Sequence, residues 1–170
     1  MRILSMKPPF ILRDVLEFGT MSKIEILDIG AMLEGDPRYA TLMSQGVGNV
    51  TGFEPNPKEL EKLNRQQNDN QQWMPEFLGN GEIATLHLTR YPGCSSLYEP
   101  DPEIIDRFLT IDASSSGGNF RVVGRKTVQT KKLNGIEACP RVDYVKIDVQ
   151  GSELDILMNG LDKCSDALVI

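Results

Sequence analysis

A short apolar segment that ends in an acid and a glycine turn constrains the fold of this chain most strongly. The segment 142–148 has the apolar character of a buried strand and ends at Asp148, and Gly151 follows three residues later. A helix is expected over 153–158. In an open parallel α/β sheet, ligands bind in the crevice beyond the carboxyl ends of the strands. Asp148 is therefore expected at a ligand site.

Two upstream segments repeat this pattern. The segment 24–29 is apolar and contains Asp28 just before Gly30, and the segment 49–54 ends at Glu54. Because parallel strands joined by right-handed crossovers share one rim, the three acids are expected to line a single cleft. Such a cleft would hold a polar, partly cationic small molecule.

Strands and helices alternate along the chain as in parallel βαβ winding. Strands are expected over 24–29, 49–54, 73–78 and 142–148, and helices over 10–18, 37–45, 57–67, 102–109 and 153–158. A further strand over 83–89 alternates in polarity and places His87 on a solvated face, and 120–131 forms one strand or a bent pair. The pattern predicts an α/β fold with a mostly parallel sheet and helices on both faces.

The last apolar residues, 167–170, begin a fifth strand at which the sequence stops. A strand edge is normally covered by a following element. We therefore interpret residues 1–170 as a single domain that is truncated within strand five. Its exposed edge could pair with a second copy, so a homo-oligomer is one alternative.

Composition excludes several classes of partner. The 170 residues include 18 Lys and Arg against 24 Asp and Glu, a net charge of −6, and no basic run is interleaved with aromatic residues. Nucleic acid is therefore not expected as a partner.

The three cysteines are far apart and form no C-x-x-C pair, so no metal site is expected. No stretch approaches the roughly 20 apolar residues of a membrane span, and no signal peptide is recognisable, so a cytoplasmic protein without membrane contact is expected.

The turn after the first strand indicates which cofactor the cleft accepts. Gly30 and Gly35 match the outer glycines of the dinucleotide fingerprint, but Met32 replaces the middle glycine, and Glu34 is anionic. Both changes oppose a bound pyrophosphate and disfavour NAD. S-adenosylmethionine has no phosphate and fits better. Glu54 could then accept hydrogen bonds from both ribose hydroxyls.

Asp28 could face the cationic methionine end of that cofactor. The alternative is that Asp28 and Glu54 only stabilise the following helices as N-terminal acids.

Four segments together resemble the FkbM family of S-adenosylmethionine-dependent methyltransferases: 27–31, 52–57, 95–97 and 146–153. The resemblance implies a Rossmann-like class I methyltransferase sheet. It also implies methyl transfer to a hydroxyl oxygen of a small molecule or sugar. The family usually has Gly-Ala-Asn-x-Gly at the first turn, which this chain lacks, so the alternative is a catalytically silent binding or interaction module.

Under this resemblance, Asp148 is the candidate base for the acceptor hydroxyl, and the alternative is that it only orients substrate or cofactor. The expected cofactor-binding residues are Asp28, Gly30, Glu54, Pro55, Asn56, Gly79, Asn80 and Asp148. The expected acceptor-binding residues are Ser95, Ser96, Tyr98 and Gln150. The two serines could equally satisfy local backbone groups, and Asn80 could be a plain turn residue.

Overall fold

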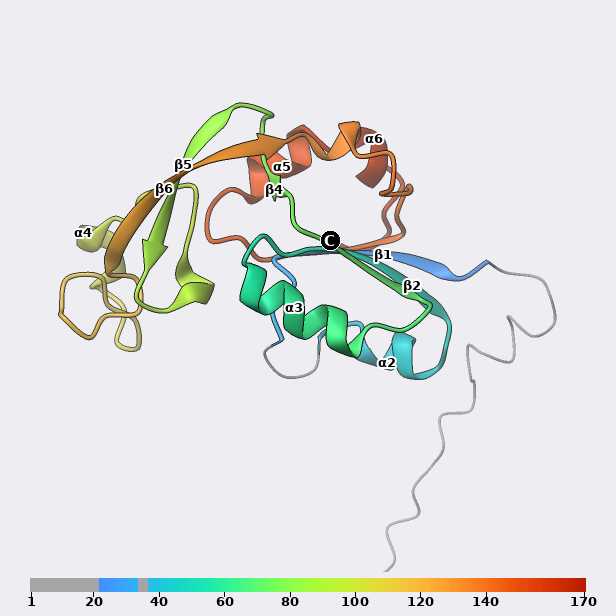
Figure 1. The fold of residues 1–170 in the computed structure, drawn as a ribbon, viewed down its shortest axis with the longest axis horizontal. Helices are drawn as coiled ribbons and strands as arrows, with labels where there is room; N and C mark the ends of the chain where they lie inside the picture. The colour runs from blue at the N-terminus through green and yellow to red at the C-terminus, as the bar shows by residue number, and fades with distance from the viewer. Residues whose placement is uncertain (1–21, 34–36) are drawn as a thin grey trace, which may run out of the picture.

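The computed structural model describes residues 22–33 and 37–170, and its main feature is a four-stranded parallel sheet (Figure 1). The strand order is β3–β2–β1–β7, with β1 at Ile24–Ile29, β2 at Gly48–Phe53, β3 at Gln71–Met74 and β7 at Tyr144–Ile147. The chain moves outward from β1 to β3 and then returns to the other side of β1. This order is consistent with a Rossmann-like fold.

Helices cover both faces of this sheet, as expected from the sequence. On one face lie α2 (Ala40–Ser44) and α3 (Pro57–Gln66), and on the other lie α5 (Glu153–Met158) and α6 (Leu161–Cys164) (Figure 1). The start of α3 is fixed locally, because the Asn56 side chain accepts a hydrogen bond from the amide of Lys58 and a proline occupies the first turn.

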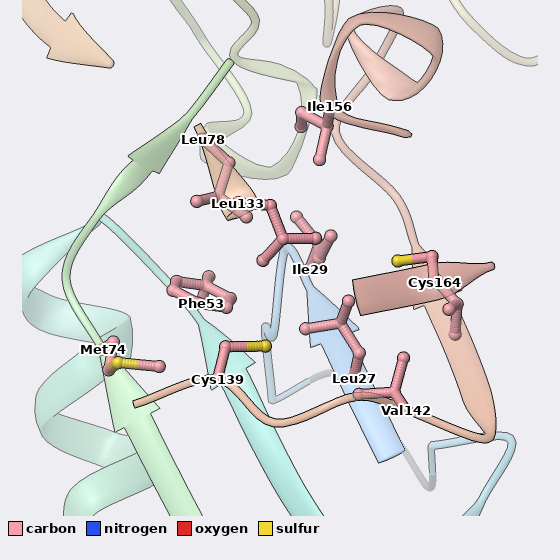
Figure 2. Packing of buried hydrophobic residues seen from close by; sticks show 11 residues of the cluster. Leu27, Ile29, Phe53, Met74, Leu78, Leu133, Cys139, Val142, Ile156 and Cys164 are labelled. Atoms are coloured by element: carbon pink, nitrogen blue, oxygen red, sulfur yellow. The ribbon is translucent and has the colours of Figure 1, made fainter. Parts of the chain in front are cut away.

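The larger hydrophobic core lies on the α5 and α6 face. Figure 2 shows this cluster, in which Ile29 and Leu133 lie between Ile156 on one side and Leu27 and Phe53 on the other. A smaller cluster on the opposite face contains Ile26 and Val50. The neighbouring residues Ile26 and Leu27 of β1 therefore pack into different cores, so this strand needs apolar side chains on both of its faces.

A second, three-stranded sheet has the order β4–β6–β5, with β4 at Phe77–Leu78, β5 at Ile83–Thr89 and β6 at Val122–Lys131. The pair β5 and β6 is antiparallel, whereas β4 runs parallel to β6. Short helical turns complete the fold: η1 (Pro92–Cys94), α4 (Pro102–Ile105) and η2 (Leu133–Gly135). In Figure 1, β5 and β6 extend away from the parallel sheet toward α4.

The single strand expected over 73–78 is wrong. The structure divides this segment into β3 and β4, which belong to different sheets. Pro75 lies between them and has no amide hydrogen to donate to a continuing ladder. The chain therefore leaves the parallel sheet at this proline.

The solvated position expected for His87 is also wrong. The residues His87 and Thr89 are only 8% and 5% exposed. Ser96 forms an isolated antiparallel bridge with His87, with backbone hydrogen bonds of 2.8 and 3.2 Å. The loop after β5 thus folds back and pairs along the edge of β5 that β6 leaves free.

Several expected elements are shorter in the structure. The helices expected over 37–45 and 102–109 are confined to α2 and α4, and the segment 167–170 forms only a parallel bridge between Val169 and Tyr144. The helix expected over 10–18 lies outside the described residues. Within the described ranges, no helix has the length and apolar character needed to span a membrane.

Candidate functional site

A cavity of about 990 Å³ lies where the carboxyl ends of the parallel strands face the second sheet. This volume is at the upper end of the range of roughly 300–1,000 Å³ for small-molecule sites. The expected site residues that line it are Asp28, Gly30, Glu54, Pro55, Asn56, Ser95, Ser96, Asp148 and Gln150. The three strand-end acids therefore share one cavity, and their roles in binding remain predictions.

Glu54 is a buried acid at the end of β2, with 7% of its surface exposed. Its Oε1 accepts a 2.7 Å hydrogen bond from the Asn56 amide, and no described residue donates a hydrogen bond to Oε2. Burial raises the pKa of Glu54 to about 7, although the Asn56 amide opposes the shift. Glu54 can therefore gain or lose a proton near neutral pH and has an oxygen available for a ligand.

Replacing Glu54 with glutamine is expected to stabilise the fold by about 3 kcal/mol at pH 8 and by almost nothing at pH 4. The ordinary pKa of this carboxyl is 4.5, and in the folded protein it is about 7. Between these values the folded state binds more protons than the unfolded state, so the free energy of unfolding falls as pH rises. Glutamine is uncharged and keeps an oxygen for the Asn56 amide, so the variant avoids this loss.

Urea unfolding of both proteins at the two pH values measures this difference. Glu61→Gln is the matched control, because Glu61 is exposed on α3 and paired with Arg65. A gain for Glu54→Gln that is equal at both pH values would contradict the assigned cause.

Asp28 at the end of β1 has a protein partner at each carboxylate oxygen, but only Oδ2 accepts a hydrogen bond from a described residue. Its Oδ2 accepts a 2.5 Å hydrogen bond from the Tyr39 hydroxyl, and its Oδ1 lies 3.0 Å from Lys146 Nζ. Burial, aided by the charge of Asp28, raises the pKa of the Tyr39 hydroxyl. The Lys146 ammonium is close to Asp28 but directs its hydrogen bond to the carbonyl of Gly30, at 2.7 Å. The structure therefore gives Asp28 a cationic partner within the protein, and the acid does not add an unpaired negative charge to the cavity.

The loop between β7 and α5 holds Asp148 at the cavity. Asp148 is exposed, and its Oδ1 accepts a 3.0 Å hydrogen bond from Gln150 Nε2. Gln150 has a φ of 61°, a left-handed conformation that non-glycine residues rarely adopt and that is enriched at functional sites. Glu153 stabilises this loop by accepting hydrogen bonds from the amides of Val149 and Gly151, at 3.2 and 2.8 Å.

The hydroxyls of both serines in the η1 region bind protein groups. Ser95 Oγ accepts a 3.1 Å hydrogen bond from the Thr89 amide. Ser96 Oγ donates to the carbonyl of Gln150 at 2.6 Å and accepts from the Tyr98 amide at 3.0 Å. This arrangement favours the interpretation that the serines order the backbone around the cavity rather than bind an acceptor directly.

Three expected site residues do not line the cavity. The Tyr98 hydroxyl donates to Asp155 at 2.6 Å, on an exposed part of the surface. Gly79 packs against Thr130, and Asn80 is exposed and bonds to Glu82 in its own turn. The plain turn role of Asn80 is therefore the one that its contacts support.

Lys146 and Tyr39 line the cavity and were not expected from the sequence. Lys146 had a usable signal, because a charged residue inside an otherwise apolar parallel strand needs a partner. It is two residues before Asp148, and it is in register with Asp28 on β1. The position of Tyr39 had no such signal, since it depends on the path of the chain into α2.

No group of three or more His, Cys, Asp or Glu side chains within 22–33 and 37–170 is arranged to hold a metal ion. Comparison with family models shows that residues 28–169 match the methyltransferase FkbM domain. Neither a curated protein nor a solved structure matches the chain significantly.

Proposed function

Since this chain belongs to the FkbM methyltransferase family, we propose that it transfers a methyl group from S-adenosylmethionine to a hydroxyl oxygen of a small molecule or sugar. The observation that carries the proposal is the buried Glu54 at the end of β2, in the same cavity as Asp148. An acid at this position accepts hydrogen bonds from the ribose hydroxyls of a nucleoside cofactor.

The cavity residues fit S-adenosylmethionine better than a dinucleotide. Met32 lines the cavity at the turn where a dinucleotide site needs a glycine, and it leaves less room for a pyrophosphate. Glu54 has a carboxylate oxygen without a hydrogen bond from any described residue, as ribose binding requires. When bound, the cofactor supplies an electrophilic methyl group on a sulfonium.

In this proposal Asp148 acts on the acceptor. Gln150 donates a hydrogen bond to Asp148 Oδ1, and no described residue donates a hydrogen bond to Oδ2. Oδ2 could accept the proton of the acceptor hydroxyl as methyl transfer proceeds, or it could only orient that hydroxyl. The cavity walls would supply the remaining contribution by holding the two ligands in line, which is worth up to ~7–11 kcal/mol in favourable cases.

Calorimetric titration with S-adenosylmethionine and with its demethylated product tests the proposal. Saturable binding is expected, and Glu54→Ala should weaken it by about tenfold or more, because hydrogen bonds to a charged group are lost. Glu61→Ala, on the exposed surface of α3, is the control and should bind normally. No heat with either compound on a folded sample would overturn the proposal and favour a silent binding module.

A further inference from the structure

We infer that the acceptor has an apolar body and carries an anionic group, and that Lys126 on β6 binds this group. This inference rests on the proposed function, because it describes the methyl acceptor that would share the cavity with the cofactor. The ligand chemistry itself follows from the wall of the cavity that the second sheet provides.

The cavity has two chemically different walls. The ends of the parallel strands provide the polar wall, with Glu54 and Asp148. The second sheet provides Leu86, Leu88 and Lys126. Leu86 is paired with Lys126 across the β5–β6 ladder, and Leu88 is paired with Gly124, two residues before Lys126. Residues two apart on a strand point to the same side, so Leu86, Leu88 and Lys126 share one face of the sheet.

The loop after β5 continues the apolar wall. Tyr91, Pro92 and Leu97 line the same cavity, and Leu88 and Tyr91 remain 37% and 38% exposed. Exposed apolar groups inside a cavity favour a ligand that removes them from water. A neutral sugar would instead turn its hydroxyls toward leucine side chains that cannot form hydrogen bonds with them.

Lys126 is exposed and has no hydrogen bond or ion pair with any described residue, and the same holds for Arg38, which also lines the cavity. Three other cations are paired. Lys146 is paired with Asp28, Lys131 with Glu76, and Arg125 with Glu99.

The acids of the cavity do not neutralise Lys126. Asp28 is paired with Lys146, Glu76 with Lys131 and Glu59 with Lys62. Glu54 and Asp148 also line the cavity, and neither forms an ion pair with Lys126. A cation beside an apolar wall gains most from an anionic ligand group, through a charge-assisted hydrogen bond. A ligand with an apolar chain and a carboxylate or similar anion satisfies both features at once.

Binding of 12-hydroxydodecanoate to the full chain, measured by calorimetry without cofactor and below its micelle concentration, tests the inference. The comparison compound is 1,12-dodecanediol, which has the same apolar body and no charge. The wild type is expected to bind the anion about tenfold more tightly than the diol. Lys126→Met should remove this preference, and Lys126→Arg should keep it.

Arg125→Met is the matched control. It removes the same charge from the adjacent position of β6, but Arg125 does not line the cavity and its ion pair is exposed. This variant should keep the preference for the anion. Equal affinity for the two compounds in the folded wild type, a preference that survives Lys126→Met, or no binding of the anion would each overturn the inference.

These outcomes are separate from those of the proposed function. A chain that binds S-adenosylmethionine, and methylates both compounds equally well, would retain the function and lose the inference. A chain that binds no cofactor but prefers the anion through Lys126 would lose the function and retain the ligand site. Thermal unfolding of each variant confirms that the compared samples are folded.

Discussion

Replacing Asp148 with asparagine is expected to lower the rate of methyl transfer by about 100- to 10,000-fold, the range that a general base contributes. Asparagine keeps the size of the side chain and an oxygen that can accept the hydrogen bond from Gln150. It cannot take the proton of the acceptor hydroxyl. Initial rates with a hydroxylated acceptor, together with calorimetry of the demethylated cofactor, separate the chemical step from binding, which should change by no more than a few-fold.

Asp155→Asn is the control for this experiment. Asp155 is an exposed acid on α5 that binds the Tyr98 hydroxyl and does not line the cavity, so turnover should be nearly normal. Unchanged turnover in Asp148→Asn would refute the base assignment. A parallel loss of cofactor affinity and rate would instead favour the orienting role.

Replacing Gly30 with alanine is expected to destabilise the fold by about 3–5 kcal/mol. Gly30 has a φ of +76°, and a Cβ atom there would lie 2.1 Å from the carbonyl oxygen of Asp148. The first effect is backbone strain, and the second is an overlap with backbone that cannot rotate away. The loop after β1 and the loop after β7 must therefore separate, and the cavity would be distorted as well.

The Gly46→Ala variant isolates the strain from the overlap. Gly46 has a similar φ of +72°, and an added Cβ would meet no atom within 4 Å. This variant should lose only about 1–2 kcal/mol, the cost of the left-handed conformation. Denaturant unfolding of both variants gives the comparison, and equal losses would show that the approach of Gly30 to Asp148 is not tight.

The elements that the sequence predicted best are those with local signals. The strand at 24–29 and the helix beginning at Pro57 match the structure, because a mostly apolar segment and a capping residue depend only on nearby residues. The sequence also predicted that the three acids lie together at one edge of the sheet, since parallel winding places the carboxyl ends of the strands side by side.

The remaining features depend on contacts between distant parts of the chain. Nothing near His87 indicates that Ser96 folds back to pair with it, or that β4 joins β6 rather than β3. The pairing of Asp28 with Lys146 joins residues 118 positions apart, by 146 − 28. The strand patterns therefore located the three acids of the site. They did not show that one of them, Asp28, is paired with Lys146.

The hydroxyl of Ser96, in the loop after β5, donates a hydrogen bond to the backbone carbonyl of Gln150. The Gln150 side chain in turn donates a hydrogen bond to Asp148. An engineered change intended to broaden the range of accepted compounds at the β5 side will shift the carboxylate as well. Selectivity and turnover should consequently change together in libraries built on this loop, and variants that alter one without the other should come from positions farther along β6.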